Sequence, residues 1–261
     1  MGAVWGRRGD ELSPALTPTT RNGIAMEVDE GAARAGVLVA FTGRAGGVSD
    51  PPYDSLNLAL TVGDEGSAVH ENRRRAAAAL GFEPWALALA VQVHGSDVLP
   101  VRWRRTGLMG TGDALVTQSR RPVLGLLTAD CAPVVLLGRR LAVAHAGWRG
   151  LTGGVVAKAA AAAGPVRVAW VGPSIRRCCY EVGHEVVEAF TAAGLPVADP
   201  THVDIPDATA AALRLAGVEA VAVSAVCTGC DPRWFSHRRD GTTGRNGAFA
   251  ALRRPERAPK A

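Results

Sequence analysis

Three short apolar runs follow one another closely between residues 123 and 145, in the stretch VLGLLTADCAPVVLLGRRLAVAH. Each run is short for a helix and rich in Val and Leu, which is typical of buried strands. The turn GRR leaves no room for the crossover that parallel neighbours need, so residues 123–145 are predicted to form an antiparallel hairpin. This pairing favours an α+β layered fold with mostly antiparallel or mixed sheets over a doubly wound sheet.

The register of this hairpin determines whether Cys131 and His145 can belong to one site. Side chains alternate between the two faces of a strand, so pairing decides which residues share a face. A three-residue loop near Gly138 would pair residues whose numbers sum to an even value, and Cys131 and His145 would then share a face. Opposed Cβ atoms lie about 4.5–5.5 Å apart, so both side chains could reach one atom. An odd register would exclude a shared site.

The apolar periodicity elsewhere predicts strands and helices that do not alternate strictly. Predicted strands are 37–42, 86–93, 123–128, 133–137, 141–145, 167–171 and 220–226. Predicted helices are 69–80, 151–163, 184–193 and 204–216. No linker or internal repeat interrupts them. We therefore predict a flexible N-terminal leader (1–35), a single domain (36–253) and a disordered tail (254–261).

Composition restricts the class of protein and its partners. The chain has 261 residues and a formal net charge of +5, which permits an anionic ligand. The basic residues are scattered and only 5% of residues are aromatic, whereas a nucleic-acid surface needs a basic stripe with stacking rings. No apolar run approaches the roughly 18 residues that span a bilayer. We expect a reduced, cytoplasmic protein, a monomer or small homo-oligomer, with no nucleic-acid or membrane partner.

Two of the six histidines share an unusual position. His94 and His145 each end an apolar strand and are followed by a turn that contains glycine. With Cys131 they would form a zinc set that leaves a fourth position open, as in catalytic zinc sites. Two other interpretations remain open on the residues alone. The three side chains could be buried and satisfied by backbone, or Cys131 and His145 could be a nucleophile and its base, with Asp97 or Asp130 orienting the histidine.

The other four cysteines form two local pairs. Cys178 and Cys179 are adjacent, and Cys227 and Cys230 form a Cys-x-x-Cys pair. The second pair could be half of a zinc site or a redox pair, but no second Cys-x-x-Cys completes it and adjacent cysteines chelate awkwardly. A structural role or an incidental pairing is therefore expected.

Three loops place arginines among glycines: GRAGGVS (43–49), GWRGLTGG (147–154) and RRDGTTGR (238–245). None is a Walker A loop or a dinucleotide fingerprint. Backbone N–H groups and a guanidinium could jointly hold an anion. An ordinary turn with a solvated arginine would explain any single loop, but the three together favour a phosphate or carboxylate ligand.

Nine motifs occur in order along the chain. They are FTGRAGGVS, PYDSLNLAL with VGDE, ENRRR, VQVHG, GDALVT, TADCAPVVL, AVAHAGWRG, VGPSI with CCYEVG, and SHRRDGTTGR. From about Val39 to Arg253 this order resembles the laccase-domain family. Its members were first called multicopper polyphenol oxidases and are now regarded as zinc-dependent purine nucleoside phosphorylases, with adenosine deaminase and methylthioadenosine phosphorylase activities. Two departures concern substrate preference: Ser174 stands where members often carry Cys, and Asn246 follows TGR.

The resemblance implies an α/β/β/α layered fold related to cysteine-hydrolase-like toxins. It also implies a catalytic zinc ion and an anion-contacting arginine. The zinc ligands would be His94, Cys131 and His145. The arginine would be Arg44, and we extend this role to Arg149 and Arg245. The expected reaction is phosphorolysis of inosine, guanosine or adenosine, so the expected partners are a purine nucleoside and phosphate, with Asp130 and Asp240 as weak candidates for the proton donor.

The residues leave three rival functions open. A multicopper oxidase needs roughly ten histidines to ligate its copper ions, and the chain has six, so copper is disfavoured. A cysteine-type amidase or hydrolase, for example one that edits peptidoglycan precursors, would use Cys131 and His145, and bound zinc would silence that thiolate. An anion-binding module without turnover is the remaining, least favoured alternative.

Overall fold

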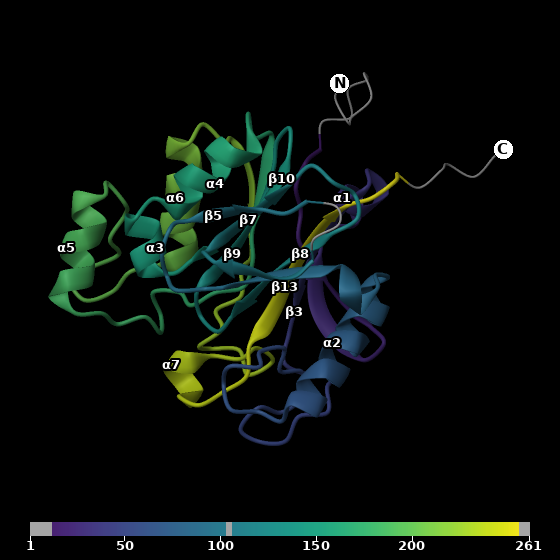
Figure 1. Cartoon of the computed structure of the whole chain (residues 1–261). Helices are drawn as coiled ribbons and strands as arrows, with labels where there is room; N and C mark the ends of the chain where they lie inside the picture. The colour runs from purple at the N-terminus through teal and green to yellow at the C-terminus, as the bar shows by residue number, and fades with distance from the viewer. Residues whose placement is uncertain (1–11, 103–105, 256–261) are drawn as a thin grey trace.

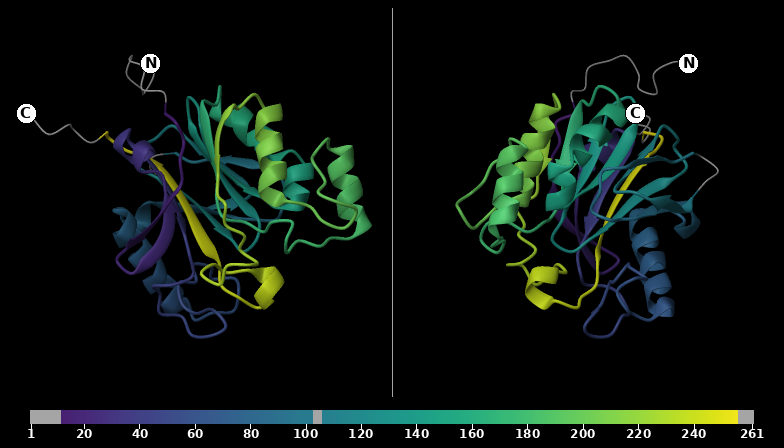
Figure 2. Two further views of the ribbon diagram at one scale, coloured as in Figure 1. Left: turned by 180° about the vertical axis from the view of Figure 1, so that it is seen from behind. Right: turned by 60° about the vertical axis from the view of Figure 1, so that its left-hand side comes forward.

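Two mixed β-sheets are stacked face to face, with helices on both outer faces, in the computed structural model, which describes residues 12–102 and 106–255 (Figures 1 and 2). The first sheet contains, in spatial order, β1 (Thr17–Arg21), β2 (Ile24–Val28), β3 (Val37–Thr42), β13 (Asn246–Leu252), β8 (Val123–Thr128), β4 (Leu87–Val91) and β6 (Gly107–Thr111). The second contains β12 (Ala220–Val223), β11 (Val168–Val171), β9 (Ala132–Leu137), β10 (Leu141–Ala146), β7 (Ala114–Thr117) and β5 (Val98–Pro100).

The helices are divided between the outer faces. Helix α2 (Gly66–Leu80) covers the first sheet. The second sheet is covered by α3 (Trp148–Thr152), α4 (Val155–Ala163), α5 (His184–Ala192) and α6 (Ile205–Leu215). Short helices α1 (Glu30–Arg34), η1 (Pro84–Ala86) and α7 (His237–Asp240) lie in connections. Among the described residues no helix is both long and apolar enough to cross a membrane.

Three apolar clusters hold these layers together and confirm the predicted α/β/β/α arrangement. One lies between α2 and the first sheet, and another between the second sheet and its helices. The third lies between the two sheets and includes Phe41 and Leu126 from the first and Val135 and Trp170 from the second. Trp170 is fully buried there and its indole N–H donates to Asp29, 2.7 Å away.

The predicted hairpin register is confirmed for β9 and β10. His145 pairs with Pro133, and a three-residue loop joins Leu137 to Leu141. The odd-numbered residues of both strands face the space between the sheets, while the even-numbered ones face the helices. Cys131, directly before β9, therefore shares the inner side with His145.

The hairpin is shorter than predicted, because residues 123–128 do not belong to it. They form β8, which lies in the first sheet between β13 and β4. The chain crosses from one sheet to the other between Thr128 and Ala132. Cys131 consequently lies at the point where the two sheets meet.

The prediction of a flexible leader over residues 1–35 is wrong where the structure describes it. Strands β1 and β2 pair with each other, and β2 pairs with β3, so this segment extends the first sheet. Ile24, Met26 and Val28 are buried against α2, and this packing explains why the segment is ordered. Residues 1–11 of the leader and 256–261 of the predicted tail lie outside the described residues.

Candidate active site

The three residues expected to bind zinc converge at the junction of the two sheets. His94 follows β4, Cys131 precedes β9, and His145 lies in β10. Their ligand atoms all lie within 4.8 Å of one another, and the two imidazole rings are 4.9 Å apart between centroids. His145 is buried, Cys131 half-buried and His94 exposed, so the group opens to one side.

Asp113 orients two of these residues at once. Its carboxylate lies 2.8 Å from His145 Nδ1 and accepts backbone N–H bonds from Val93, His94 and Gly95 at 3.2, 2.9 and 2.7 Å. Burial raises the pKa of Asp113, but the bonds from His145 and these N–H groups outweigh it and hold the pKa below its usual value. An ionised Asp113 accepts a hydrogen bond from His145 Nδ1–H. The proton thus stays on Nδ1, and the Nε2 lone pair is available for a metal.

Local backbone conformation aims His94 and Cys131 at the same point. His94 adopts a left-handed φ of 59°, which aligns three successive N–H groups onto Asp113. Gln92 bonds the backbone of Leu127 through both ends of its amide, at 2.9 Å each. The end of β4 is thereby fixed to the end of β8, shortly before the chain reaches Cys131. Asp130 adopts a left-handed φ of 90° at the crossover.

Cys131 and His145 form an electrostatically coupled pair. Burial opposes the charged form of both groups, but their mutual attraction prevails. It lowers the pKa of Cys131 to about 6, with help from hydrogen bonds of both histidines. The same attraction, together with Asp113, raises the pKa of His145 to about 9. Without a metal ion the pair is therefore a thiolate and an imidazolium.

This donor set fits a catalytic zinc ion. Two imidazole nitrogens and one thiolate from different elements approach one point, and one histidine carries the carboxylate partner typical of zinc ligands. Gly147 closes one side, because a Cβ there would lie 2.8 Å from Cys131 Sγ and 2.9 Å from His94 Cδ2. The open side faces a cavity, where a fourth ligand can enter.

The cavity has a volume of about 860 Å³, which is large enough for a drug-sized ligand. His94, Cys131 and His145 form part of its lining, which also contains the arginines 73, 149, 238 and 245. Tyr180 lines it too, and burial raises its pKa to about 12, so that its hydroxyl keeps its proton. Arg238 stacks 4.9 Å from the Tyr180 ring. The cavity thus combines a metal-type centre with several positive charges.

Arg149 and Arg245 line the same cavity as His94, Cys131 and His145, whereas Arg44 does not line it. The guanidinium of Arg44 bonds Asp54 at 2.8 Å and Asp240 at 3.3 Å and stacks on Phe235. These two carboxylates, of which Asp240 belongs to α7, fix the position of the Arg44 guanidinium. The anion-contacting role expected for Arg44 stays a prediction, and its guanidinium lies outside the lining that contains Arg149 and Arg245.

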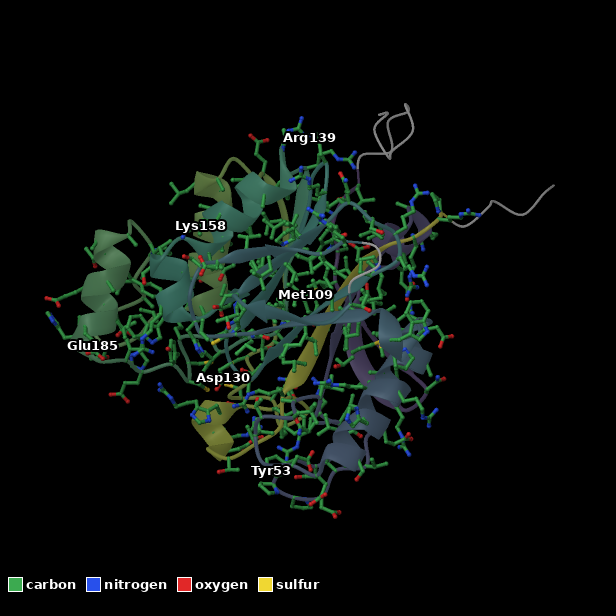
Figure 3. All side chains as sticks on the ribbon, in the orientation of Figure 1. Tyr53, Met109, Asp130, Arg139, Lys158 and Glu185 are labelled. Carbon is green, nitrogen blue, oxygen red and sulfur yellow. The ribbon has the colours of Figure 1, made fainter. Side chains whose placement is uncertain are left out.

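The acids suggested by sequence are committed elsewhere. Asp130 accepts from the hydroxyl of Thr228 and the backbone N–H of Arg238, both at 2.7 Å. Asp97 contributes its backbone carbonyl to Asp113 and Ala114. Neither orients His145, which is the role of Asp113. Figure 3 shows Asp130 beside α7, at the crossover between the sheets.

Several functional residues were missed from the sequence. Asp113 stands directly before β7, in GDALVT, and only knowledge that β7 pairs with β10 would have placed it beside His145. Tyr180 and Arg238 come from distant loops that meet at the cavity. His70 is exposed on α2 and also lines the cavity.

The chain is similar to several named proteins and solved structures. The Escherichia coli protein named purine nucleoside phosphorylase YfiH is 40% identical over 231 residues, covering 83% of this chain and 94% of that one. A Mycobacterium bovis protein that is also named purine nucleoside phosphorylase is 41% identical over 230 residues, covering 81% of this chain and 89% of that one. The crystal structure of YlmD from Geobacillus stearothermophilus superposes with a TM-score of 0.83 at 32% identity, covering 92% of this chain and all of that one. The model of the family described as "Multi-copper polyphenol oxidoreductase laccase" matches residues 38–253, and the chain belongs to this laccase-domain family.

Proposed function

We propose that this protein is a zinc-dependent purine nucleoside phosphorylase. The observation that carries the proposal is the shared cavity, in which the His94–Cys131–His145 group lies together with four arginines. The names of the curated relatives support the same activity. Adenosine deaminase and methylthioadenosine phosphorylase reactions are proposed as side activities of the same centre.

In phosphorolysis the bond between C1′ of ribose and the purine nitrogen breaks, and a phosphate oxygen forms a new bond to C1′. Arg149 and Arg245 bind and orient the phosphate, and Arg238 adds positive charge on the same cavity wall. The base leaves with a proton. Tyr180 supplies a protonated hydroxyl in the cavity that can donate a hydrogen bond to the departing base.

His94, Cys131 and His145 would hold the zinc ion, and Asp113 would orient His145 through Nδ1. Bound zinc supplies a Lewis acid that also acidifies water, which is the chemistry that deamination of adenosine requires. The apolar part of the cavity, including Leu87, Leu89 and Leu108, provides the surface against which a purine ring packs.

The proposal is tested with purified protein of measured metal content, incubated with inosine or adenosine with and without phosphate. Phosphate-dependent release of free base and ribose-1-phosphate is the expected result. Arg149→Gln should raise KM for phosphate several-fold, because Arg149 lines the cavity. Arg139→Gln is the matched control, since Arg139 lies in the hairpin turn at the other end of β10. No phosphate-dependent product from any purine nucleoside would refute the assignment.

A second candidate function rests on the arrangement in which His145 interacts with Cys131 on one side and with Asp113 on the other. A thiolate beside a histidine that a carboxylate orients is the arrangement of cysteine hydrolases. The apo protein should then cleave amides in a Cys131-dependent manner and lose this activity when zinc is added. Phosphorolysis instead requires the metal, so the effect of added zinc on each activity separates the two functions.

A further inference from the structure

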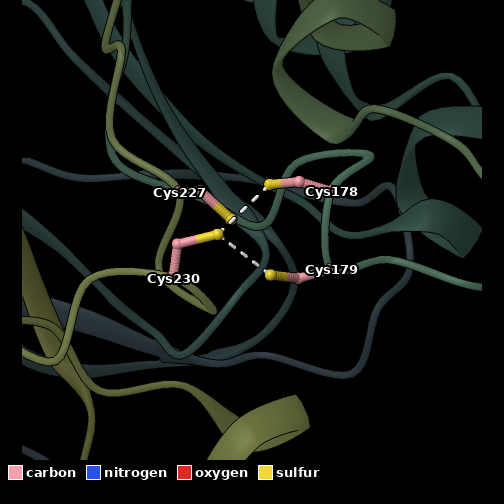
Figure 4. A group of neighbouring side chains, drawn as sticks. All are labelled: Cys178, Cys179, Cys227 and Cys230. Atoms are coloured by element: carbon pink, nitrogen blue, oxygen red, sulfur yellow. Dashed lines mark hydrogen bonds between the residues drawn. The ribbon is translucent and has the colours of Figure 1, made fainter.

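Four cysteines from two distant segments converge on one point outside the cavity. Cys178 and Cys179 lie between β11 and α5, and Cys227 and Cys230 lie between β12 and α7. Their four sulfur atoms all lie within 4.8 Å of one another, and the side chains point toward a common centre (Figure 4). The two cysteine pairs, for which the sequence indicated a structural role or an incidental pairing, thus lie close enough to share one ion.

The spacing of these sulfur atoms approaches that of a tetrahedral four-thiolate site. A zinc–sulfur bond of about 2.3 Å implies sulfur atoms about 3.8 Å apart in a regular tetrahedron. Cys230 Sγ lies 3.3 Å from Cys178 Sγ and 3.1 Å from Cys179 Sγ. Shifts of only a fraction of an ångström would bring these sulfur atoms to the tetrahedral spacing. Cys178 and Cys230 are exposed, so their side chains have room to make these shifts.

The turn from Cys227 to Cys230 is shaped for this approach. Backbone N–H groups of Cys230 and Asp231 bond the Cys227 carbonyl at 3.2 and 3.0 Å, which turns both sulfurs to one side. The Arg176 N–H donates to Cys227 Sγ at 3.4 Å, as N–H groups do around metal-bound thiolates. A Cβ on Gly229 would lie 2.7 Å from Cys179 Cβ, so glycine permits the close contact.

Local charge also suits a metal–thiolate group. A zinc ion with four thiolates carries a net charge of −2, which nearby cations stabilise. Arg238 reaches the carbonyl oxygens of Cys179 and Glu181, and Arg239 reaches that of Thr228 at 2.7 Å. The two arginines of α7 thus bind the backbone of both cysteine segments.

From this juxtaposition we propose a second, structural zinc site, formed by Cys178, Cys179, Cys227 and Cys230. The site clamps two loops that contribute to the cavity wall, because Tyr180 follows Cys179 directly and Arg238 follows the Cys227–Cys230 turn. Its role is to fix these loops, since four protein ligands leave no open position for catalysis.

The test uses full-length protein prepared under reducing conditions and counts the metal bound to wild-type protein and to the His94→Ala variant. Wild-type protein should hold two zinc ions per chain, and His94→Ala should hold one. Cobalt(II) bound to His94→Ala protein should show the intense sulfur-to-metal charge-transfer absorption of a four-thiolate site. Because His94→Ala disables the cavity centre, this outcome does not depend on the proposed phosphorylase activity.

Cys230→Ser and Cys178→Ser, each combined with His94→Ala, should abolish this cobalt signal. If these variants fail to fold, stepwise thiol titration of wild-type protein with a mercurial reagent replaces them and should release zinc in two phases. In a second preparation without reductant, thiols counted after denaturation with a chelator test for the alternative, a disulfide: all five cysteines react if none had formed, and two fewer react for each disulfide. A disulfide, or folded His94→Ala protein that binds neither zinc nor cobalt, would overturn the proposal.

Discussion

Asp113 occupies the centre of the hydrogen-bond network around the candidate catalytic metal. We expect Asp113→Asn to weaken zinc binding by about 10–100-fold. The neutral amide no longer fixes the His145 tautomer, and it cannot accept all three backbone N–H hydrogen bonds that the carboxylate accepts. Competition with a chromophoric chelator measures the affinity. Asp97→Asn is the matched control, since the exposed Asp97 contributes a backbone carbonyl to this region. Equal affinities in both variants would contradict the role given to Asp113.

Glu27 is a buried acid that faces the space between the sheets. Its side chain is 7% exposed, and among the described residues Oε2 has no hydrogen-bond partner. Burial raises the folded-state pKa of Glu27 above 4.5, although Ser224 and Arg233 oppose this. The unfolded chain therefore loses this proton first as pH rises, so Glu27 lowers the free energy of unfolding above that pH.

Glu27→Gln should remove this pH-dependent cost. The stability difference between variant and wild type should be small near pH 4 and should grow in favour of the variant as pH rises towards neutral. Denaturant unfolding at several pH values measures it. Glu83→Gln changes an exposed glutamate and should leave the pH profile unaltered. A constant difference across the pH range would disprove the assignment to Glu27.

The sequence predicted the residues of the metal group but only part of their surroundings. His94 and His145 were recognisable because each ends an apolar run, and the register of the hairpin brought Cys131 to the same face. Asp113 and Tyr180 were not recognisable, because their positions depend on which strands pair and which loops meet. The glycine-rich motif around Arg44 also did not reveal that its guanidinium pairs with Asp54 and Asp240.

At the scale of elements, the predicted helix over residues 151–163 is two helices. It is interrupted at Gly153 and Gly154, and Gly154 adopts a left-handed φ of 79°. The apolar periodicity continues through both helices, so the sequence pattern concealed the break. The short helix α3 begins at Trp148, and its first turn carries Arg149 into the cavity.

Gly154→Ala should destabilise the protein by about 1 kcal/mol, because a Cβ at this φ is strained. No atom lies within 4 Å of that Cβ, so the loss comes from backbone conformation and not from a clash. Gly66→Ala tests this, since Gly66 begins α2 without a left-handed φ and should lose no stability. Both are measured by denaturant unfolding; equal effects would exclude the conformational explanation.

Six of the seven predicted strands match a strand of the structure within two residues, and β3 and β8 match their predicted bounds. Strands β1, β2, β5, β6, β7 and β13 were not predicted. The notable omission is β13, which is buried along its whole length between β3 and β8. Its sequence NGAFAAL follows a glycine-rich loop and contains three alanines, which are not typical of strands. Burial on both faces, which favours small side chains, was not visible in a local pattern.

For the whole molecule, the layered architecture was predictable but the assignment of strands to sheets was not. Strands β8 and β9 are neighbours in sequence and belong to different sheets. The candidate active site exists because of this crossover, since it combines the end of β4 in the first sheet with β9, β10 and the start of β7 in the second.

The hairpin of β1 and β2 also concerns the whole molecule, because it ends the first sheet. Strand β1 contains Pro18 and polar, largely exposed residues, whereas β3 behind it is buried throughout. Deleting residues 1–28 would uncover the unpaired edge of β3, and we expect light scattering to show self-association. Deleting residues 1–11 keeps the hairpin and should leave the protein monodisperse. The hairpin thus covers this edge of the first sheet and prevents strands of other molecules from pairing with β3.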